Sequence, residues 1–261
     1  MPLTPLPTLP DEPKKDGPED DVHLTLMQHL EDLRRRLKWA LLWIVIGFLV
    51  CYHWAKDLFH VLMRPVLASL PEGEKALHFS SSIEPFMIYL KVGLYAGLFV
   101  AIPAVLYQVW AFVAPGMYHR EQRAIVPFVV SSSLMFLIGS AFCYFVILPP
   151  AFHFLIVEAA GPDIKPVLMM SDQLGLVLTL LVAFGIVFEI PLVLTSLSML
   201  DIVNWRWLAK YRRHAIVVNV IIAAIVTPTG DPFNLALMAV PMILCYELGI
   251  LGARLFAKKK N

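Results

Sequence analysis

The residues of this sequence that could do chemistry are a few carboxylates that stand among basic residues. Glu121 lies in the short polar loop Tyr118–Arg123, and Glu31 and Asp32 come just before three consecutive arginines. A carboxylate binds a guanidinium group through two parallel hydrogen bonds, a geometry that lysine cannot copy. A ligand with two neighbouring arginines would therefore suit two such carboxylates supplied by different segments.

One further carboxylate, Glu189, lies inside an apolar segment, in the sequence AFGIVFEIP over residues 183–191. It stands twelve residues before Asp201 and seventeen after Asp172. A charged carboxylate at the centre of a membrane-spanning helix costs about 2.5–3.5 kcal/mol, so such residues usually face protein or water. Two interpretations stay open: a protonated acid bonded to a neighbouring helix, or a functional polar site.

Other chemistry finds no support in the residues. The sequence has no Walker A loop, no HExxH and no GxSxG motif, which argues against nucleotide hydrolysis and the common intramembrane hydrolases. The eight histidines show no pair at metal-ligand spacing, and the cysteines Cys51, Cys143 and Cys245 are isolated within apolar segments, as buried structural cysteines are. Ser131–Ser133 is more typical of helix packing than of nucleophilic catalysis. We therefore expect that the protein is not an enzyme, that it binds no metal or cofactor, and that it has no nucleic-acid-binding surface.

The composition predicts an all-α polytopic membrane protein. The chain has 261 residues, of which 59% are hydrophobic and 16% charged, and its mean hydropathy is +0.72. The apolar residues come in near-continuous blocks, and one helical span needs about 20 of them. We predict six membrane-spanning helices, over Leu37–Trp54, Phe86–Ala114, Ala124–Leu148, Leu174–Leu200, Ala215–Val226 and Phe233–Phe256.

The distribution of basic residues predicts the orientation of these helices. With six spans and a cytoplasmic N-terminus, 16 of the 21 lysines and arginines lie on the cytoplasmic side. The other five are Lys56, Arg64, Lys75, Lys91 and Lys165. This asymmetry follows the positive-inside rule and predicts that both termini are cytoplasmic. We expect residues 1–20 to be a disordered tail, 21–257 a single membrane domain, and 258–261 a basic tail.

The fifth and sixth blocks are short. Thirteen residues lie between Arg213 and Thr227, which gives roughly 20 Å of helix against a hydrocarbon core of about 30 Å. The sixth block, up to about Leu251, is only slightly longer. Two adjacent short helices must thin the bilayer locally or leave a depression beside them.

Three shorter features concern the ends of the spans. The stretch from Asp21 predicts an amphipathic helix on the cytoplasmic surface, with Glu31–Arg35 and Asp32–Arg36 pairs at i,i+4. In the first outer loop, Pro65 is expected to break a helical piece. The pair Pro149–Pro150 is expected to end the third span.

In six stretches the sequence resembles the TatC family, the multi-spanning subunit of the twin-arginine protein translocase. The resemblance covers nearly the whole chain, from about His23 to Ala257. It rests on HLEDLRRRL at 29–37, YQVWAFVAP at 107–115, GMYHREQR at 116–123, AFGIVFEIP at 183–191, TPTGDPF at 227–233 and AVPMILCYELG at 239–249. The resemblance implies six spans, cytoplasmic termini and a concave shape with short fifth and sixth helices.

The resemblance also implies the function. TatC-like proteins of the bacterial cytoplasmic (inner) membrane bind twin-arginine signal peptides on folded cargo. They work within the lipid bilayer with TatB- and TatA-like single-span partners, driven by the proton-motive force, and are oligomeric in the complex. The alternative is a proton-coupled small-solute transporter with Glu189 as its proton carrier. No inverted internal repeat of the kind common in such transporters is visible.

The family's functional residues match seven positions of this sequence, or eight if Glu31 and Asp32 are both counted. Glu121 matches the acid of the first cytoplasmic loop, implicated in gripping the twin arginines. The second acid falls on Asp32, where the family usually has Glu, which leaves the role open between Asp32 and Glu31. The remaining matches are Arg34 and Phe112 at the same cytoplasmic patch, Glu189 as an intramembrane contact to a partner helix, and Pro65 and Asp231 in the outer loops.

Overall fold

The computed structural model describes residues 18–70, 77–113, 125–158, 167–199, 202–227 and 231–256. Apart from one isolated bridge between His78 and Met169, the regular structure of these ranges is helical, which confirms the all-α prediction. The elements are α1 (Pro18–Tyr52), α2 (Ala55–Ala68), α3 (Glu84–Val113), α4 (Ile125–Phe142), η3 (Cys143–Ile147), α5 (Leu148–His153), η4 (Phe154–Glu158), α6 (Met170–Met199), α7 (Trp205–Lys210), α8 (Arg212–Val226) and α9 (Pro232–Phe256). The predicted disordered tail 1–20 is wrong for residues 18–20, which form the first residues of α1. Residues 1–17 and the predicted basic tail 258–261 lie outside the described residues.

Within the described ranges, four helical stretches are long and apolar enough to cross a membrane. They are Glu84–Phe112, Val126–Ile156, Met170–Met199 and Pro232–Leu255. A fifth span is obtained if Leu30–Tyr52 and Ala55–Ala68, bent by 89°, are taken together. The protein is therefore a multi-pass membrane protein, and the count of six spans stays a prediction.

The two C-terminal helices differ in length. Helix α8 has 15 residues, or about 22 Å, which confirms that the fifth predicted helix is short. Helix α9 has 25 residues, or about 37 Å, because it continues past Leu251 through Arg254 to Phe256. The shortness expected of both helices therefore applies to α8 alone.

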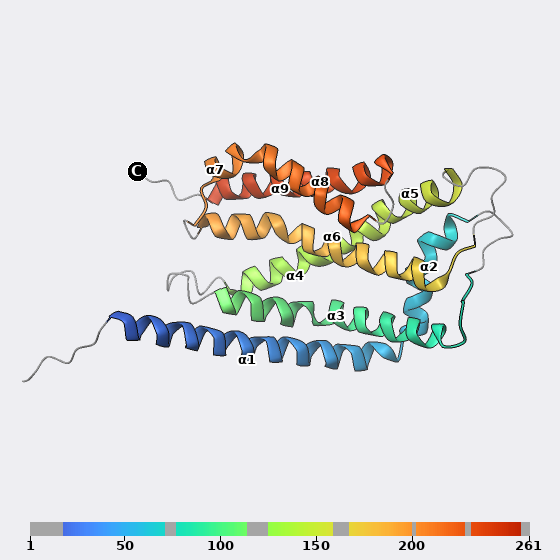
Figure 1. Ribbon diagram of the computed structural model, residues 1–261, viewed down its shortest axis with the longest axis horizontal. Helices are drawn as coiled ribbons and strands as arrows, with labels where there is room; N and C mark the ends of the chain where they lie inside the picture. Colours follow the sequence, from blue (N-terminus) through green and yellow to red (C-terminus); the bar gives the residue numbers. More distant parts are fainter. Residues whose placement is uncertain are drawn as a thin grey trace, which may run out of the picture.

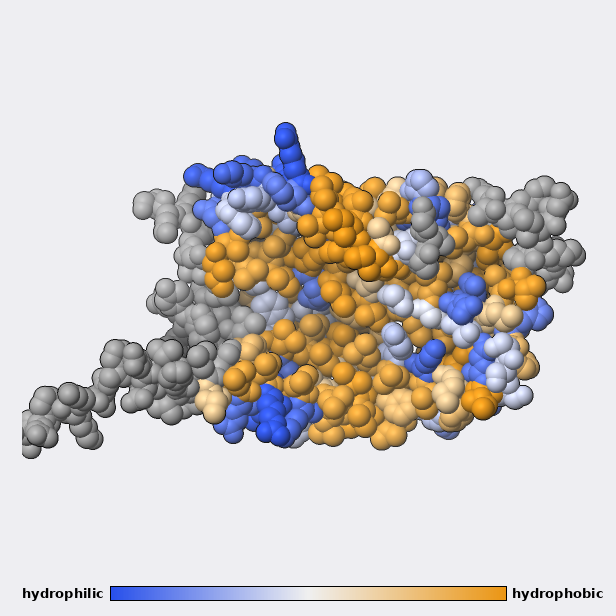
Figure 2. Space-filling model, viewed as in Figure 1, coloured by the Kyte–Doolittle hydropathy of each residue, from blue (hydrophilic) through white to orange (hydrophobic). Residues whose placement is uncertain are grey.

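The ends of the long helices define two faces of the molecule. The start of α1, the end of α9 and the short helix α7 lie at one end, which we call the inner end (Figure 1). Helix α2 lies across the opposite, outer end (Figure 1). Hydrophilic residues gather at the inner end, and a broad apolar band covers the middle of the molecule (Figure 2). This pattern is what a bilayer-spanning body requires.

Helix α1 is longer than the sequence analysis expects. The amphipathic segment is not a separate surface helix, since one helix runs from Pro18 to Tyr52. No proline or glycine occurs between Pro18 and Gly47, so nothing in the sequence ends the helix there. The predicted first span is the second half of this helix.

The prediction that Pro65 breaks a helix is wrong, because α2 continues through it to Ala68. Proline has no N–H group, which leaves the carbonyl four residues earlier, that of Val61, without its helical partner. The hydroxyl of Tyr144 donates to this carbonyl at 2.6 Å. A residue of the third span thus repairs the hydrogen bond that Pro65 removes from α2.

The prediction that Pro149–Pro150 ends the third span is also wrong. The helical path continues through α5 and η4 to Glu158. The preceding turn is a π-helix over Cys143–Ile147, and the prolines stand at the first positions of α5. In the π-helical turn just before the prolines, the Leu148 N–H donates to Cys143 O, and such turns are one of the ways in which a helix accommodates an interruption.

Close helix packing depends on glycines at three contacts. At the α1–α3 contact, a Cβ atom on Gly47 would lie 2.4 Å from the carbonyl oxygen of Gly97. Gly185 of α6 meets the ring of Phe136 of α4, and Gly252 of α9 meets Thr195 of α6. Cys51, Cys143 and Cys245 are buried and unpaired, as predicted.

At the outer end, polar contacts that were not predicted from the sequence join α3 to α6. The carboxylate of Glu84 accepts hydrogen bonds from the Ser80 backbone N–H at 2.6 Å and hydroxyl at 2.8 Å, and from the Ser171 N–H at 3.1 Å. It therefore ties the first turn of α3 to the first turn of α6. The bridge of His78 to Met169 joins the preceding segments.

The close contact of Gly97 on α3 with α1 generates a stability prediction. Gly97→Ala should destabilise the protein by about 1–3 kcal/mol, because its Cβ would overlap the backbone nitrogen of Phe48 on α1. Gly175→Ala on α6 is the matched control, since no atom lies within 4 Å of the added Cβ. We expect this control to be neutral or slightly stabilising. Thermal unfolding in detergent micelles measures both, and equal midpoints would contradict the close-packing argument.

Candidate functional site

Two of the candidate carboxylates, Glu31 and Asp32, lie in the first half of α1, the half that extends toward the inner end (Figure 1). The carboxylate of Asp32 pairs with the Arg35 guanidinium at 2.6 Å and with that of Arg36 at 3.5 Å. The i,i+4 pair of Asp32 and Arg36 was predicted, whereas Arg35 pairs with Asp32 at i,i+3 and not with Glu31. Asp32 is thus already a guanidinium-binding carboxylate.

Glu31 and Arg34 differ from Asp32 in being exposed to solvent. Neither takes part in an ion pair within the described part of the chain. Exposed ion pairs contribute only about 0–1 kcal/mol, so a competing arginine can displace Arg35 from Asp32 at little cost. Both carboxylates therefore remain accessible to a cationic ligand.

The third predicted carboxylate, Glu121, lies outside the described residues. Its loop follows the end of α3, where the half-buried Phe112 lies. Helices α1 and α3 run side by side, so the end of α3 and the start of α1 face the same end of the molecule (Figure 1). The end of α3, with Phe112, and the first half of α1, with Arg34 and the two carboxylates, therefore lie toward the same end of the molecule.

The intramembrane carboxylate Glu189 lies at a junction of three helices. The hydroxyl of Ser132 on α4 donates to Glu189 Oε2 on α6. The indole Nε1–H of Trp110 on α3 donates to Ser132 Oγ at 3.2 Å. Ser132 and Trp110 are buried, at 0% and 7% exposure. A continuous hydrogen-bond chain therefore connects α3, α4 and α6 through the interior.

The second oxygen of this carboxylate is a vacant acceptor. Glu189 Oε1 is buried and has no hydrogen-bond partner among the described residues. Buried polar atoms in native proteins nearly always have a partner, and one left without costs about 1–3 kcal/mol. Glu189 thus keeps one buried acceptor that the described residues leave unused.

Asp231 at the outer end has a visible structural role. It precedes Pro232, the first residue of α9, and its carboxylate accepts from the Asn234 N–H at 2.7 Å and the Asn234 side-chain amide at 3.0 Å. This is an N-cap followed by proline at the first helical position. Of the two outer-loop candidates, Asp231 thus caps the start of α9, whereas Pro65 lies inside α2.

Three residues of these contacts were not singled out by the sequence analysis: Trp110, Ser132 and Glu84. Ser132 was assigned to helix packing as part of Ser131–Ser133, and its bonds to Glu189 and Trp110 distinguish it from its neighbours. Within the described ranges, no group of three His, Cys, Asp or Glu side chains could hold a metal ion. The polar groups of the candidate sites are carboxylates that can bind cations or hydrogen-bond donors.

Comparisons with known proteins agree with this arrangement. The family model described as Sec-independent protein translocase protein (TatC) matches residues 28–241. The chain is 40% identical over 240 residues to the Sec-independent protein translocase protein TatC of Koribacter versatilis, covering 91% of this chain and 88% of that protein. It is 35% identical over 234 residues to the TatC of Escherichia coli K12, covering 90% of each.

Solved structures of TatC proteins also match this chain. A crystal structure of the twin arginine translocase receptor TatC matches with a TM-score of 0.76 at 37% identity, covering 87% of this chain and 99% of that one. A second structure of this receptor, in DDM, matches with a TM-score of 0.77 at 38% identity, covering 85% and 98%. Matched by a family model, by full-length relatives and by solved structures, the chain belongs to the TatC family of Sec-independent protein translocases, which are transport proteins and not enzymes.

Proposed function

We propose that this protein is the receptor and core component of a twin-arginine translocase, which binds the paired arginines of signal peptides on folded cargo. The observation that carries the proposal is the Asp32 carboxylate, which already binds two guanidinium groups at the inner end of a TatC-family chain. An incoming arginine pair can take over these contacts. Glu121, from the loop after α3, supplies the second carboxylate, and Glu31, Arg34 and Phe112 complete the surface.

Glu189 is the proposed contact for a single-span partner of the TatA or TatB type. Its vacant oxygen lies in a membrane-spanning helix, where a donor on a partner helix meets no competition from water. A side-chain amide or hydroxyl on such a helix would complete the carboxylate's hydrogen bonds. The proposed partner contact is therefore a single polar bond within an apolar interface.

We place the inner end in the cytoplasm of a bacterium, with the protein in the inner membrane and the proton-motive force driving transport. The start of α1, the end of α9 and the helix α7 lie at the same end (Figure 1). Helix α7 carries Arg206 and Lys210, and α8 begins directly after it with Arg212 and Arg213. The positive-inside rule assigns that end to the cytoplasm. Family membership favours this function over a proton-coupled solute transporter.

Signal-peptide binding tests the receptor assignment. A fluorescent twin-arginine peptide should bind the protein in nanodiscs, and its twin-lysine counterpart should bind about tenfold more weakly, since lysine cannot bind a carboxylate bidentately. Glu121→Gln and Asp32→Asn should each weaken binding about tenfold, and Glu31→Gln should do so less. Asp57→Asn, an exposed acid at the outer end, is the control. Equal binding by all variants and both peptides would remove the receptor assignment.

The hydrogen-bond chain yields a second test, on partner assembly. Ser132→Ala removes the donor that holds Glu189, and we expect about fivefold less co-purified TatB-like partner and less export. Ser133→Ala is the matched control, because that buried hydroxyl donates to Val129 O on its own helix. Glu189→Ala should impair assembly and leave signal-peptide binding nearly intact. Unchanged assembly in both Ser132→Ala and Glu189→Ala would take Glu189 out of the partner site.

A further inference from the structure

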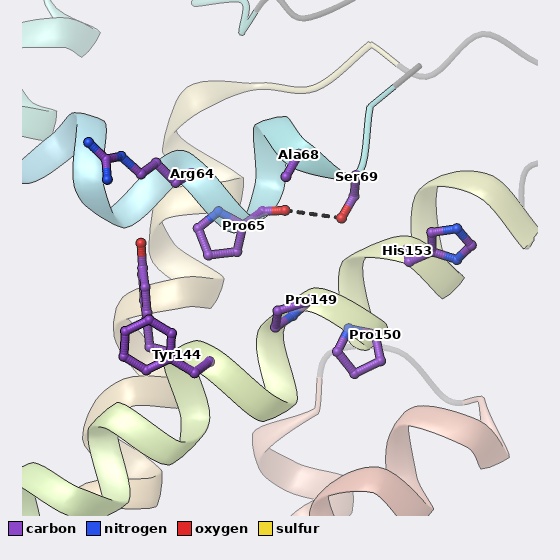
Figure 3. Close-up of a pocket in the computed structure, with 9 residues that line it drawn as sticks. Arg64, Pro65, Ala68, Ser69, Tyr144, Pro149, Pro150 and His153 are labelled. Carbon is purple, nitrogen blue, oxygen red and sulfur yellow. Dashed lines mark hydrogen bonds between the residues drawn. The ribbon is translucent and has the colours of Figure 1, made fainter. Parts of the chain in front are cut away.

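We propose that a cavity between α2 and the outer end of the third span binds the phosphate group of one phospholipid from the outer leaflet. The cavity has a volume of about 500 Å³. It is lined on one side by α2 and on the other by the path from η3 to α5 (Figure 3). This proposal is independent of the signal-peptide receptor function.

The position of the cavity fits the headgroup region of a bilayer. Helix α2 is bent by 89° from the membrane-crossing part of α1, so it lies along the bilayer surface when α1 crosses it. Its buried residues, among them Pro65 and Val66, face the protein, whereas Arg64 is exposed. Amphipathic helices in this orientation lie at the boundary between headgroups and acyl chains.

One wall of the cavity faces hydrocarbon. Phe145 lines the cavity and is 71% exposed, although it belongs to a membrane-crossing stretch. The rings of Pro149 and Pro150 form the wall opposite α2 (Figure 3). These rings and Phe145 offer an apolar surface along which the acyl chains of a lipid can lie. The cavity therefore joins the hydrocarbon to the headgroup level.

The residues that line the cavity include one permanent cation, the guanidinium group of Arg64, and one histidine. Arg64 lies at one end and His153 at the other (Figure 3). Neither forms an ion pair with any residue in the described ranges. An arginine facing lipid requires an anion, and a guanidinium group binds phosphate through two parallel hydrogen bonds. The phosphodiester of a membrane lipid is the anion present at this depth.

The hydroxyl groups of the cavity argue for a lipid over a peptide. The Tyr144 hydroxyl donates to Val61 O at 2.6 Å, and the Ser69 hydroxyl donates to Pro65 O at 3.0 Å. Both donors are thus used to complete α2. The cavity offers one guanidinium group and apolar walls, which match a phosphate with acyl chains better than they match a polypeptide backbone.

The test is native mass spectrometry of the delipidated full-length protein titrated with phosphatidylglycerol. We expect one tightly bound lipid on the wild type and about tenfold weaker binding to Arg64→Gln, with a smaller loss for His153→Gln. Lys56→Gln is the matched control, because it removes the same charge from an exposed position of α2 outside the cavity. Ala68→Phe, which fills the cavity without a change of charge, should also abolish binding.

Two further probes separate the possible sources of binding. Diacylglycerol lacks the phosphate and should bind much more weakly than phosphatidylglycerol, and inorganic phosphate at the same concentration should not displace the lipid. Equal retention by Arg64→Gln and Lys56→Gln, equal binding of diacylglycerol, or displacement by inorganic phosphate would each overturn the proposal. Unfolding midpoints of the variants should match the wild type, since the substituted side chains are exposed.

Discussion

The fold depends on one constraint, that a chain within hydrocarbon must satisfy its backbone hydrogen bonds internally. Pro65, Pro149 and Pro150 each remove a donor, and the chain meets each loss differently. The carbonyl freed by Pro65 receives the Tyr144 hydroxyl, and the proline pair stands at the start of α5 behind a π-helical turn. The repair by Tyr144 links α2 to the third span, and with the Glu84 contacts it fixes the outer end.

The same constraint applies to the side chain of Glu189, whose carboxylate also needs hydrogen-bond partners inside the membrane. A carboxylate among apolar helices must have partners, and the chain supplies Ser132, itself held by Trp110, for one oxygen only. The other oxygen is buried and has no partner in the described part of the chain. An additional serine on a facing helix could have completed the site within the chain. In the proposed partner contact, the unused acceptor is the atom to which a donor on the partner helix would bind.

The helical class, the long apolar spans and the short α8 could be predicted from the sequence, because each depends on local composition and length. The effects of Pro65 and Pro149–Pro150 could not, since a proline's tolerance depends on what reaches the carbonyl it frees, and Tyr144 is 83 residues from Val61. The Ser132–Glu189 bond spans 57 residues and the Trp110–Ser132 bond 22. Nothing in the run of three serines distinguishes Ser132 from its neighbours before the helices are packed together.

The hydrogen-bond chain also connects two regions that the sequence treats separately. Trp110 stands two residues before Phe112, at the end of α3 that precedes the loop of Glu121. Its indole holds Ser132, and Ser132 holds Glu189, so the chain runs from near the proposed peptide surface into the membrane interior. The outer ends of α3 and α6 are joined through Glu84, which restrains the helices there. A displacement of the inner end of α3 would move Trp110, and with it the Ser132 hydroxyl that donates to Glu189.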